Sequence, residues 1–207
     1  MIVVDVETTG IDPQKNSIIS IGAVEFESPY NQFYRECRVD VDAQINPYAL
    51  ERNGFTLENL FDPGKINVDQ LVESFLNWTR KIELRTIAGE NPGFDREFLL
   101  QTANKYNLNW DLGYRVLDLH TLSYVHQRIR EVKPPMKNGV SDLNLDDTLN
   151  YVGLEKEPLP HNALNGALRE AEAFARLLFG RNIMPGFSSF EVPYYLRKPV
   201  ARVTYFI

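Results

Sequence analysis

The sequence contains one cysteine, Cys37, among 207 residues, so no disulfide can form within a single chain. A reducing compartment is the simplest setting for such a protein, and we expect it to be cytoplasmic. No apolar run approaches the roughly 20 residues that a membrane-spanning helix requires. The opening MIVVDVETTG has neither the basic start nor the cleavage site of a secretory signal, so none is expected.

Basic residues are also in deficit. The chain has 22 Lys and Arg against 28 Asp and Glu, a net charge of −6. Proteins that grip duplex DNA along its backbone are usually basic, so this balance argues against tight, nonspecific duplex binding. It does not exclude a nucleic-acid enzyme. Carboxylates that recruit Mg²⁺ make a site acidic, and the cations then face the phosphates.

The sequence shows no internal repeat, and 43% of its residues are hydrophobic, which is enough for one sizeable core. Short β-branched or alternating stretches between turn residues predict strands, and apolar residues at helical spacing predict helices. The predicted strands are 1–7, 17–27, 32–40, 84–90 and 114–120. The predicted helices are 46–54, 67–82, 94–106, 143–154 and 161–180. This order predicts an α/β fold with a mixed five-stranded sheet flanked by helices.

The last part of the chain differs from the rest. Residues 181–207 end in VPYYLRKPVARVTYFI, which is aromatic and β-branched but interrupted by prolines. We therefore predict a main domain over 1–180 and a C-terminal extension over 181–207. An edge hairpin, a partner-binding tail and a contact between copies of the chain all remain open for the extension.

Asp5 and Glu7 lie two residues apart on a predicted strand, so their side chains share one face, with Cα atoms roughly 6.5 Å apart. Two such carboxylates repel each other unless a cation lies between them. A solvent-exposed strand would tolerate this pair of carboxylates, but the apolar residues around the pair favour a buried strand. These residues are Ile2, Val3, Val4 and Val6.

Three segments together resemble one enzyme superfamily. VVDVETTG (3–10), GENPGFD (89–95) and HNALNGA (161–167) resemble the three motifs of the DEDD exonucleases, which include proofreading exonucleases and RNase T. The order and spacing agree over about residues 1–180. The third motif begins with a histidine, where a sister branch has tyrosine. In this it resembles the DEDDh branch of the superfamily. The resemblance implies an RNase H-like fold.

The resemblance also implies an activity: metal-dependent 3′→5′ hydrolysis of single-stranded DNA or RNA, releasing 5′-mononucleotides. In that family four carboxylates hold two Mg²⁺ or Mn²⁺ ions, and a histidine acts as general base. Carried over, the metal ligands include Asp5, Glu7 and Asp95, and the base is His161. The residues expected to bind substrate are Thr8, Thr9, Gly10, Asn91 and Phe94. For Phe94, packing in the core is the favoured alternative.

The third motif departs from the family pattern at Gly166, where the fourth metal-binding aspartate belongs. One hypothesis is that Glu170 replaces it. Glu170 lies one helical turn further, and its longer side chain leans back toward the helix N-terminus. An ordinary solvated helix residue is the alternative for Glu170. A second hypothesis gives the role to the amide of Asn165. A third is a catalytically impaired nucleic-acid-binding module that keeps the fold.

Partners are less sharply indicated. Residues 124–137 combine basic and aromatic side chains that would suit a path for single-stranded nucleic acid, or an ordinary solvated helix and loop. No membrane partner is expected. Tyr, Phe and Val residues in 190–207 leave self-association through the extension open.

Overall fold

The computed structural model describes residues 1–197 of the chain, which form two compact units. The first consists of residues 1–118 and 157–171, and the second of 119–156 and, among those described, 172–197. Helix α7 (Ala163–Phe179) runs through the last boundary and belongs in part to each unit. Within 1–197, no helix has the length and apolar character needed to cross a membrane. The predicted domain boundary after residue 180 remains a prediction.

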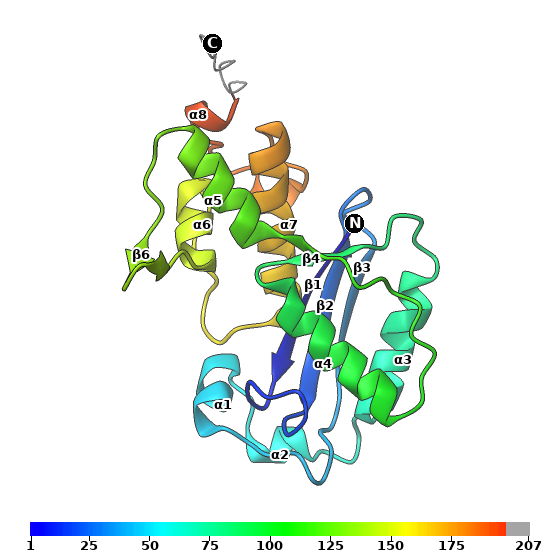
Figure 1. Cartoon of the computed structure of the whole chain (residues 1–207). Helices are drawn as coiled ribbons and strands as arrows, with labels where there is room; N and C mark the ends of the chain where they lie inside the picture. Colours follow the sequence, from blue (N-terminus) through cyan, green and yellow to red (C-terminus); the bar gives the residue numbers. More distant parts are fainter. Residues whose placement is uncertain (198–207) are drawn as a thin grey trace. The chain divides into compact units, whose positions relative to one another are not determined.

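The first unit is built on a mixed five-stranded sheet with the strand order β3-β2-β1-β4-β5 (Figure 1). The first three strands are antiparallel, and β4 and β5 continue parallel to β1. The strands are β1 (Ile2–Thr8), β2 (Ile18–Glu25), β3 (Gln32–Glu36), β4 (Ile87–Gly89) and β5 (Leu117–Asp118). The predicted mixed five-stranded sheet is therefore confirmed.

Strand β2 is slightly shorter than predicted, and β3, β4 and β5 are much shorter. The prediction of 32–40 was too long because β3 ends at Glu36, after which Arg38 and Val39 donate their backbone N–H groups to Ile66 and Leu60. Strands β4 and β5 keep only three and two residues, in place of the predicted 84–90 and 114–120. Sequence patterns do not predict where these strands end, because the ends depend on which segment of the chain each backbone pairs with in space.

Helices α3 (Val68–Thr79) and α4 (Pro92–Lys105) cover one face of this sheet (Figure 1). The side chains of Ile2, Val4 and Val6 pack against these helices in one buried cluster. Each such side chain contributes roughly 1.5–3 kcal/mol on burial. Because successive side chains alternate along a strand, Asp5 and Glu7 point to the opposite face.

The first turns of α7 lie against this opposite face. A Cβ atom at Gly22 on β2 would lie 2.1 Å from the backbone of Ala163, so only glycine permits this approach. Asp5 is the register partner of Gly22 on the neighbouring strand. Gly22 therefore brings the helix backbone directly over the strand that carries the acidic pair.

Two short helices precede α3. Helix α1 (Pro47–Asn53) begins after the cap Asn46 and ends, as predicted, at Gly54, whose φ of 72° suits glycine. Helix α2 (Leu57–Leu60) was not predicted, since four residues are too few to show a helical period. It is stabilised by a capping box from Thr56.

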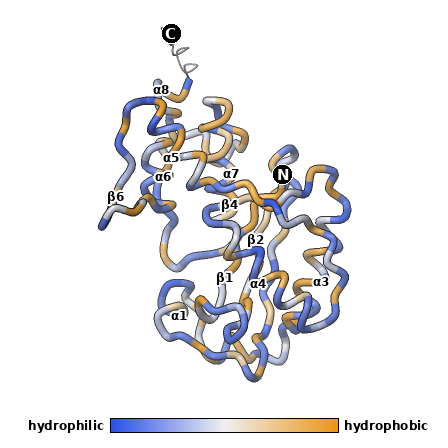
Figure 2. The backbone as a smooth tube through the Cα atoms, in the orientation of Figure 1, coloured by the Kyte–Doolittle hydropathy of each residue, from blue (hydrophilic) through white to orange (hydrophobic). Residues whose placement is uncertain are grey.

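The second unit contains α5 (Leu119–Ile129), a hairpin of β6 (Met136–Lys137) and β7 (Val140–Ser141), and α6 (Leu145–Tyr151). The hairpin was not predicted. It lies in the mainly hydrophilic connection between α5 and α6 (Figure 2). The C-terminal extension forms a 3₁₀ turn (Pro185–Phe187) and α8 (Tyr194–Arg197), with no strand in residues 181–197. The rest of it, 198–207, lies outside the described residues.

Arg176 on α7 fastens the second unit together although its side chain is fully buried. Its guanidinium donates to the carbonyl oxygens of Val152 at 2.8 Å and Phe190 at 2.9 Å. Its charge is paired with Glu172, which also accepts the backbone N–H of Met184 at 3.2 Å. The buried pair thus joins α7 to the chain that follows α6 and to the extension.

Candidate active site

The structure brings together acidic residues of the first two motif segments and Glu170, which follows the third segment. Asp5 and Glu7 come from β1, Asp95 from the first turn of α4 and Glu170 from α7. Burial raises the pKa of Asp5 well above its usual value, and the charges of Glu7 and Asp95 raise it further. Four carboxylates from three separate elements therefore share one electrostatic environment.

Asp95 is attached directly to the strand of the acidic pair. Strand β4 leads into α4 through Asn91, whose φ of 53° turns the chain, and Pro92 opens the helix. This places Asp95 at a buried position where its Oδ1 accepts the backbone N–H of Val6 at 3.0 Å. Burial raises the pKa of Asp95 to about 7 despite that hydrogen bond.

Glu170 is not a solvated helix residue, so that alternative is wrong. It is only 5% exposed, and its Oε2 has no hydrogen-bond partner within residues 1–197. The same oxygen lies 3.0 Å from where a Cβ of Gly89 would be, so the side chain reaches β4. Burial raises the pKa of Glu170, and Asp5 and Asp95 raise it further.

Gly166 lies directly over Asp5. A Cβ atom at this position would be 2.1 Å from Asp5 Oδ2, so the space of the missing side chain is taken by the strand carboxylate. Glu170 follows on the same helical face. Asn165 is exposed, and its backbone N–H bonds to the cap Asn162. The helix therefore presents Glu170 toward the buried carboxylates and Asn165 toward solvent.

His161 stands just before α7 and is held by two residues that the sequence analysis did not identify. Its backbone N–H donates to the carbonyl of Arg52 at 2.9 Å. Its ring Nε2 lies 3.2 Å from a guanidinium nitrogen of Arg52, and its Nδ1 lies 3.4 Å from Glu157 Oε2. Arg52 lies in the last turn of α1, and Glu157 lies in the connection that leads to His161.

Glu157 belongs to the acidic environment as well. Burial and then Glu157 raise the pKa of Glu7 to about 7, with Arg52 acting in the opposite direction. Glu157 also raises the pKa of Asp5. The only feature of the sequence that could have indicated Glu157 is its position four residues before His161. It lies in a proline-containing run without the periodicity that predicts a helix or a strand. Its contribution depends on the fold of that run.

A further carboxylate, Glu90, borders the site and was also missed. Burial, followed by the charge of Asp118, raises its pKa to about 8. Its Oε2 has no hydrogen-bond partner in the described structure. Asp118, at the end of β5, accepts the backbone N–H of Asn91 at 3.2 Å.

The predicted substrate-binding residues have mainly internal contacts. Thr9 is fully buried, and its hydroxyl donates to the carbonyl of Gln44 at 2.7 Å. Thr8 donates to the carbonyl of Gly10 at 2.6 Å, which closes the turn after β1. Phe94 packs on Phe98 with ring centroids 4.8 Å apart. The threonine hydroxyls thus shape the loop, and their role toward substrate stays a prediction.

The donor set suits a divalent cation. Carboxylate oxygens are the ligands that Mg²⁺ and Mn²⁺ prefer, and the unpartnered Oε2 of Glu170 lies among mutually repelling carboxylates. Within residues 1–197, however, no three His, Cys, Asp or Glu side chains are arranged to hold a metal ion as they stand. A cation held by only one or two of these carboxylates would keep water or substrate oxygens as its other ligands.

Comparisons with known proteins show which family and fold the chain is similar to. A family model described as exonuclease, named for RNase T, matches residues 2–174. The PolC-type DNA polymerase III of Thermotoga petrophila is 27% identical over 179 residues, which cover 86% of this chain and 12% of the polymerase. The 3′-5′ DNA exonuclease Cap18 of Escherichia coli is 32% identical over 126 residues, which cover 58% of this chain and 66% of Cap18.

Solved structures share the fold. The nuclease domain of 3′hExo, a DEDDh family member bound to rAMP, matches with a TM-score of 0.65 and 17% identity. The match covers 86% of this chain and 90% of that domain. The predicted RNase H-like architecture is confirmed by this likeness.

Proposed function

The chain belongs to the exonuclease family of RNase T, and we propose that it is a metal-dependent 3′→5′ exonuclease acting on single-stranded DNA or RNA. The proposal is carried by one observation: Asp5, Asp95 and Glu170 share one buried acidic environment although they lie far apart in sequence. Clustered carboxylates of raised pKa destabilise a fold, so they are expected where a cation or a reaction requires them.

The groups of the site have separable roles. Asp5, Glu7, Asp95 and Glu170 would hold the divalent cations, with Glu170 in the role of the missing aspartate. Those cations supply activation of the attacking water and stabilisation of charge on the leaving oxygen. His161 adjoins the same environment through Glu157 and is the candidate general base.

The reaction balances with these groups. The water oxygen bonds to the terminal phosphorus as the bond from that phosphorus to the preceding 3′ oxygen breaks. The proton lost by water passes to Nε2 of His161, and the 3′ oxygen takes a proton from solvent. The products are a 5′-mononucleotide and a chain one residue shorter.

Arg52 is the candidate for binding the substrate phosphate. Its exposed guanidinium lies beside His161 and acts to lower the pKa of Glu7, so it adjoins the carboxylates. A phosphodiester is a stronger acceptor for guanidinium than a neutral imidazole, because both partners of the hydrogen bond are then charged. Backbone groups of Thr8, Thr9 and Gly10, with Asn91, would contact the terminal nucleotide.

The rival function is a binding module without catalysis, which Gly166 alone favours. Burial of Glu170 weighs against it, because a buried carboxyl group one turn from Gly166, with no hydrogen-bond partner for its Oε2 in the described structure, can replace the ligand that the glycine lacks. A module that only binds nucleic acid gains nothing from that cost.

The test is degradation of 5′-labelled single-stranded DNA and RNA oligonucleotides with Mg²⁺ or Mn²⁺. We expect a ladder that shortens from the 3′ end with wild-type protein and is lost in Asp5→Asn and Glu170→Gln. Mn²⁺ at about 100 times its Kd should also stabilise the wild type by about 2.7 kcal/mol, and Glu170→Gln should reduce this. A ladder undiminished in Glu170→Gln would contradict the assigned role of Glu170. No ladder on either substrate would favour the binding module.

A further inference from the structure

The imidazole of His161 lies between two charged side chains. Its Nε2 is 3.2 Å from a guanidinium nitrogen of Arg52, and its Nδ1 is 3.4 Å from Glu157 Oε2. A guanidinium can only donate hydrogen bonds, so Nε2 must be the accepting nitrogen. In a neutral ring the single proton then resides on Nδ1 and faces the carboxylate.

Glu157 is itself fixed. Its side chain is 5% exposed, and its Oε1 accepts the backbone N–H of Asn162 at 3.0 Å. One carboxylate thus faces both the ring of His161 and the backbone of the next residue. This arrangement needs two accepting oxygens. A glutamine has only one, so it would have to turn an NH₂ group toward one of the two N–H donors.

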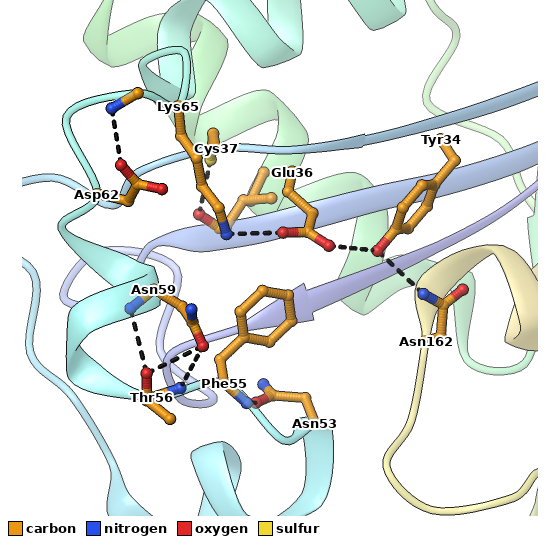
Figure 3. Close-up of polar contacts among 12 residues, drawn as sticks. Tyr34, Glu36, Cys37, Asn53, Phe55, Thr56, Asn59, Asp62, Lys65 and Asn162 are labelled. Atoms are coloured by element: carbon orange, nitrogen blue, oxygen red, sulfur yellow. Dashed lines mark hydrogen bonds and ion pairs between the residues drawn. The ribbon is translucent and has the colours of Figure 1, made fainter.

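Asn162 connects this arrangement to the sheet. Its side-chain oxygen caps the first turn of α7. Its amide nitrogen donates to the hydroxyl of Tyr34 on β3 at 2.9 Å. Tyr34 in turn donates to Glu36, which accepts from Lys65 at 2.6 Å (Figure 3). The segment that carries Glu157 and His161 is therefore held on β3 by a continuous chain of polar contacts.

We propose that Glu157 is a positioning residue for His161: it holds the ring as the Nδ1–H tautomer, so that Nε2 is the nitrogen that accepts the proton of the attacking water. The proposal rests on the proposed function. It assigns Glu157 no contact with substrate or with the reacting atoms.

The positions of Arg52 and Glu157 also suggest when Nε2 of His161 becomes available to accept a proton. While Arg52 donates to Nε2, the lone pair is occupied. An arriving phosphodiester draws the guanidinium away, because the charged acceptor binds it more strongly. Nε2 is then available, and the imidazolium formed on proton transfer is stabilised by the charge of Glu157.

A metal ligand is the competing role for Glu157, since its charge raises the pKa of both Asp5 and Glu7. The two roles predict different results. Replacing a residue that only positions His161 preserves metal binding, whereas replacing a metal ligand removes it.

The first test measures the tautomer in the wild-type protein, without substrate. The chain has only three histidines, so ¹⁵N labelling of histidine and comparison with His161→Gln would assign the ring signals. At a pH where the ring is neutral, we expect protonated Nδ1 and unprotonated Nε2. Protonated Nε2 would overturn the proposal whether or not the protein is an active exonuclease.

The second test uses Glu157→Gln, with Glu155→Gln as the matched control at an exposed site on the same connection. We expect Glu157→Gln to lose the tautomer preference and to lower kcat by about 10²-fold or more, with KM nearly unchanged. Its Mn²⁺-induced thermal shift should persist. A lost Mn²⁺ shift would instead make Glu157 a ligand, and unchanged kcat would refute the positioning role. Wild-type protein that never cleaves would refute the proposed function, while the tautomer measurement would still stand.

Discussion

Replacing Asp95 by asparagine should stabilise the metal-free protein at alkaline pH. Asparagine keeps the Oδ1 oxygen that accepts the N–H of Val6, so the buried hydrogen bond to β1 survives. The substitution removes only the negative charge, which lies buried beside other carboxylates. We therefore expect Asp95→Asn to gain stability while it loses metal binding and activity.

The pKa of Asp95 sets the size of the effect. It rises from 3.8 to about 7 on folding, and each unit corresponds to roughly 1.4 kcal/mol, so ionisation above pH 7 costs the fold at most about 4 kcal/mol. Because neighbouring carboxyl groups can take up protons in its place, a gain of about 1–4 kcal/mol is expected. For a chain of this size that raises Tm by several degrees.

The effect has a definite pH dependence. Below pH about 4 the carboxyl group is protonated in both the folded and the unfolded chain, so it contributes nothing. Between pH about 4 and 7 the folded state alone binds the proton, so wild-type stability falls as pH rises. The advantage of Asp95→Asn should thus be full at pH 8 and small near pH 4.5.

Thermal melts followed by circular dichroism in EDTA at both pH values would measure this. Asp111→Asn is the control of opposite sign: burial acts to raise the pKa of Asp111, but hydrogen bonds from Arg85 and Arg80 lower it overall. Asp111→Asn should therefore not stabilise the protein at pH 8. If Asp95→Asn proved less stable than wild type at pH 8, or gained equally at both pH values, the charge argument would be refuted.

Three other substitutions give separate outcomes. Gly166→Ala should lower exonuclease activity on the order of 10²-fold, because the new Cβ would lie 2.1 Å from a carboxylate oxygen on β1. Gly113→Ala is the control and should leave activity unchanged, because its Cβ would have no described atom within 4 Å. Arg176→Met should lower the free energy of unfolding in urea by about 3–5 kcal/mol, since it leaves Glu172 buried without its partner; a loss below 1 kcal/mol would contradict this. Arg52→Ala should raise KM for oligonucleotides at least several-fold, as steady-state kinetics would show, and an unchanged KM would remove Arg52 from phosphate binding.

Local patterns in the sequence were sufficient for the sheet and for most of the acidic residues. The β-branched run around Asp5 and Glu7 predicted β1 and the common face of the pair, because strand alternation is a property of neighbouring residues. The segment before Asp95 likewise predicted a helix start. The boundaries of β3, β4 and β5 could not be predicted, since each depends on where the backbone finds a partner.

The burial of Glu170 could not be predicted from the sequence. Its position one turn after Gly166 indicated that it faces the same way, but the sequence alone left burial and solvation equally open. The structure decides for burial, because the side chain of Glu170 reaches β4, where its Oε2 would lie 3.0 Å from a Cβ of Gly89.

The roles of Glu157 and Arg52 required the tertiary structure altogether. Neither residue lies in a motif, and Arg52 on α1 is more than 100 positions from Glu157 in the connection before α7. The sequence by itself determined the sheet, the helix that carries Glu170 and the identity of the base candidate. Only the folded chain decided which charges surround that base, because electrostatic and hydrogen-bonding partners are set by distance in space and not by separation along the chain.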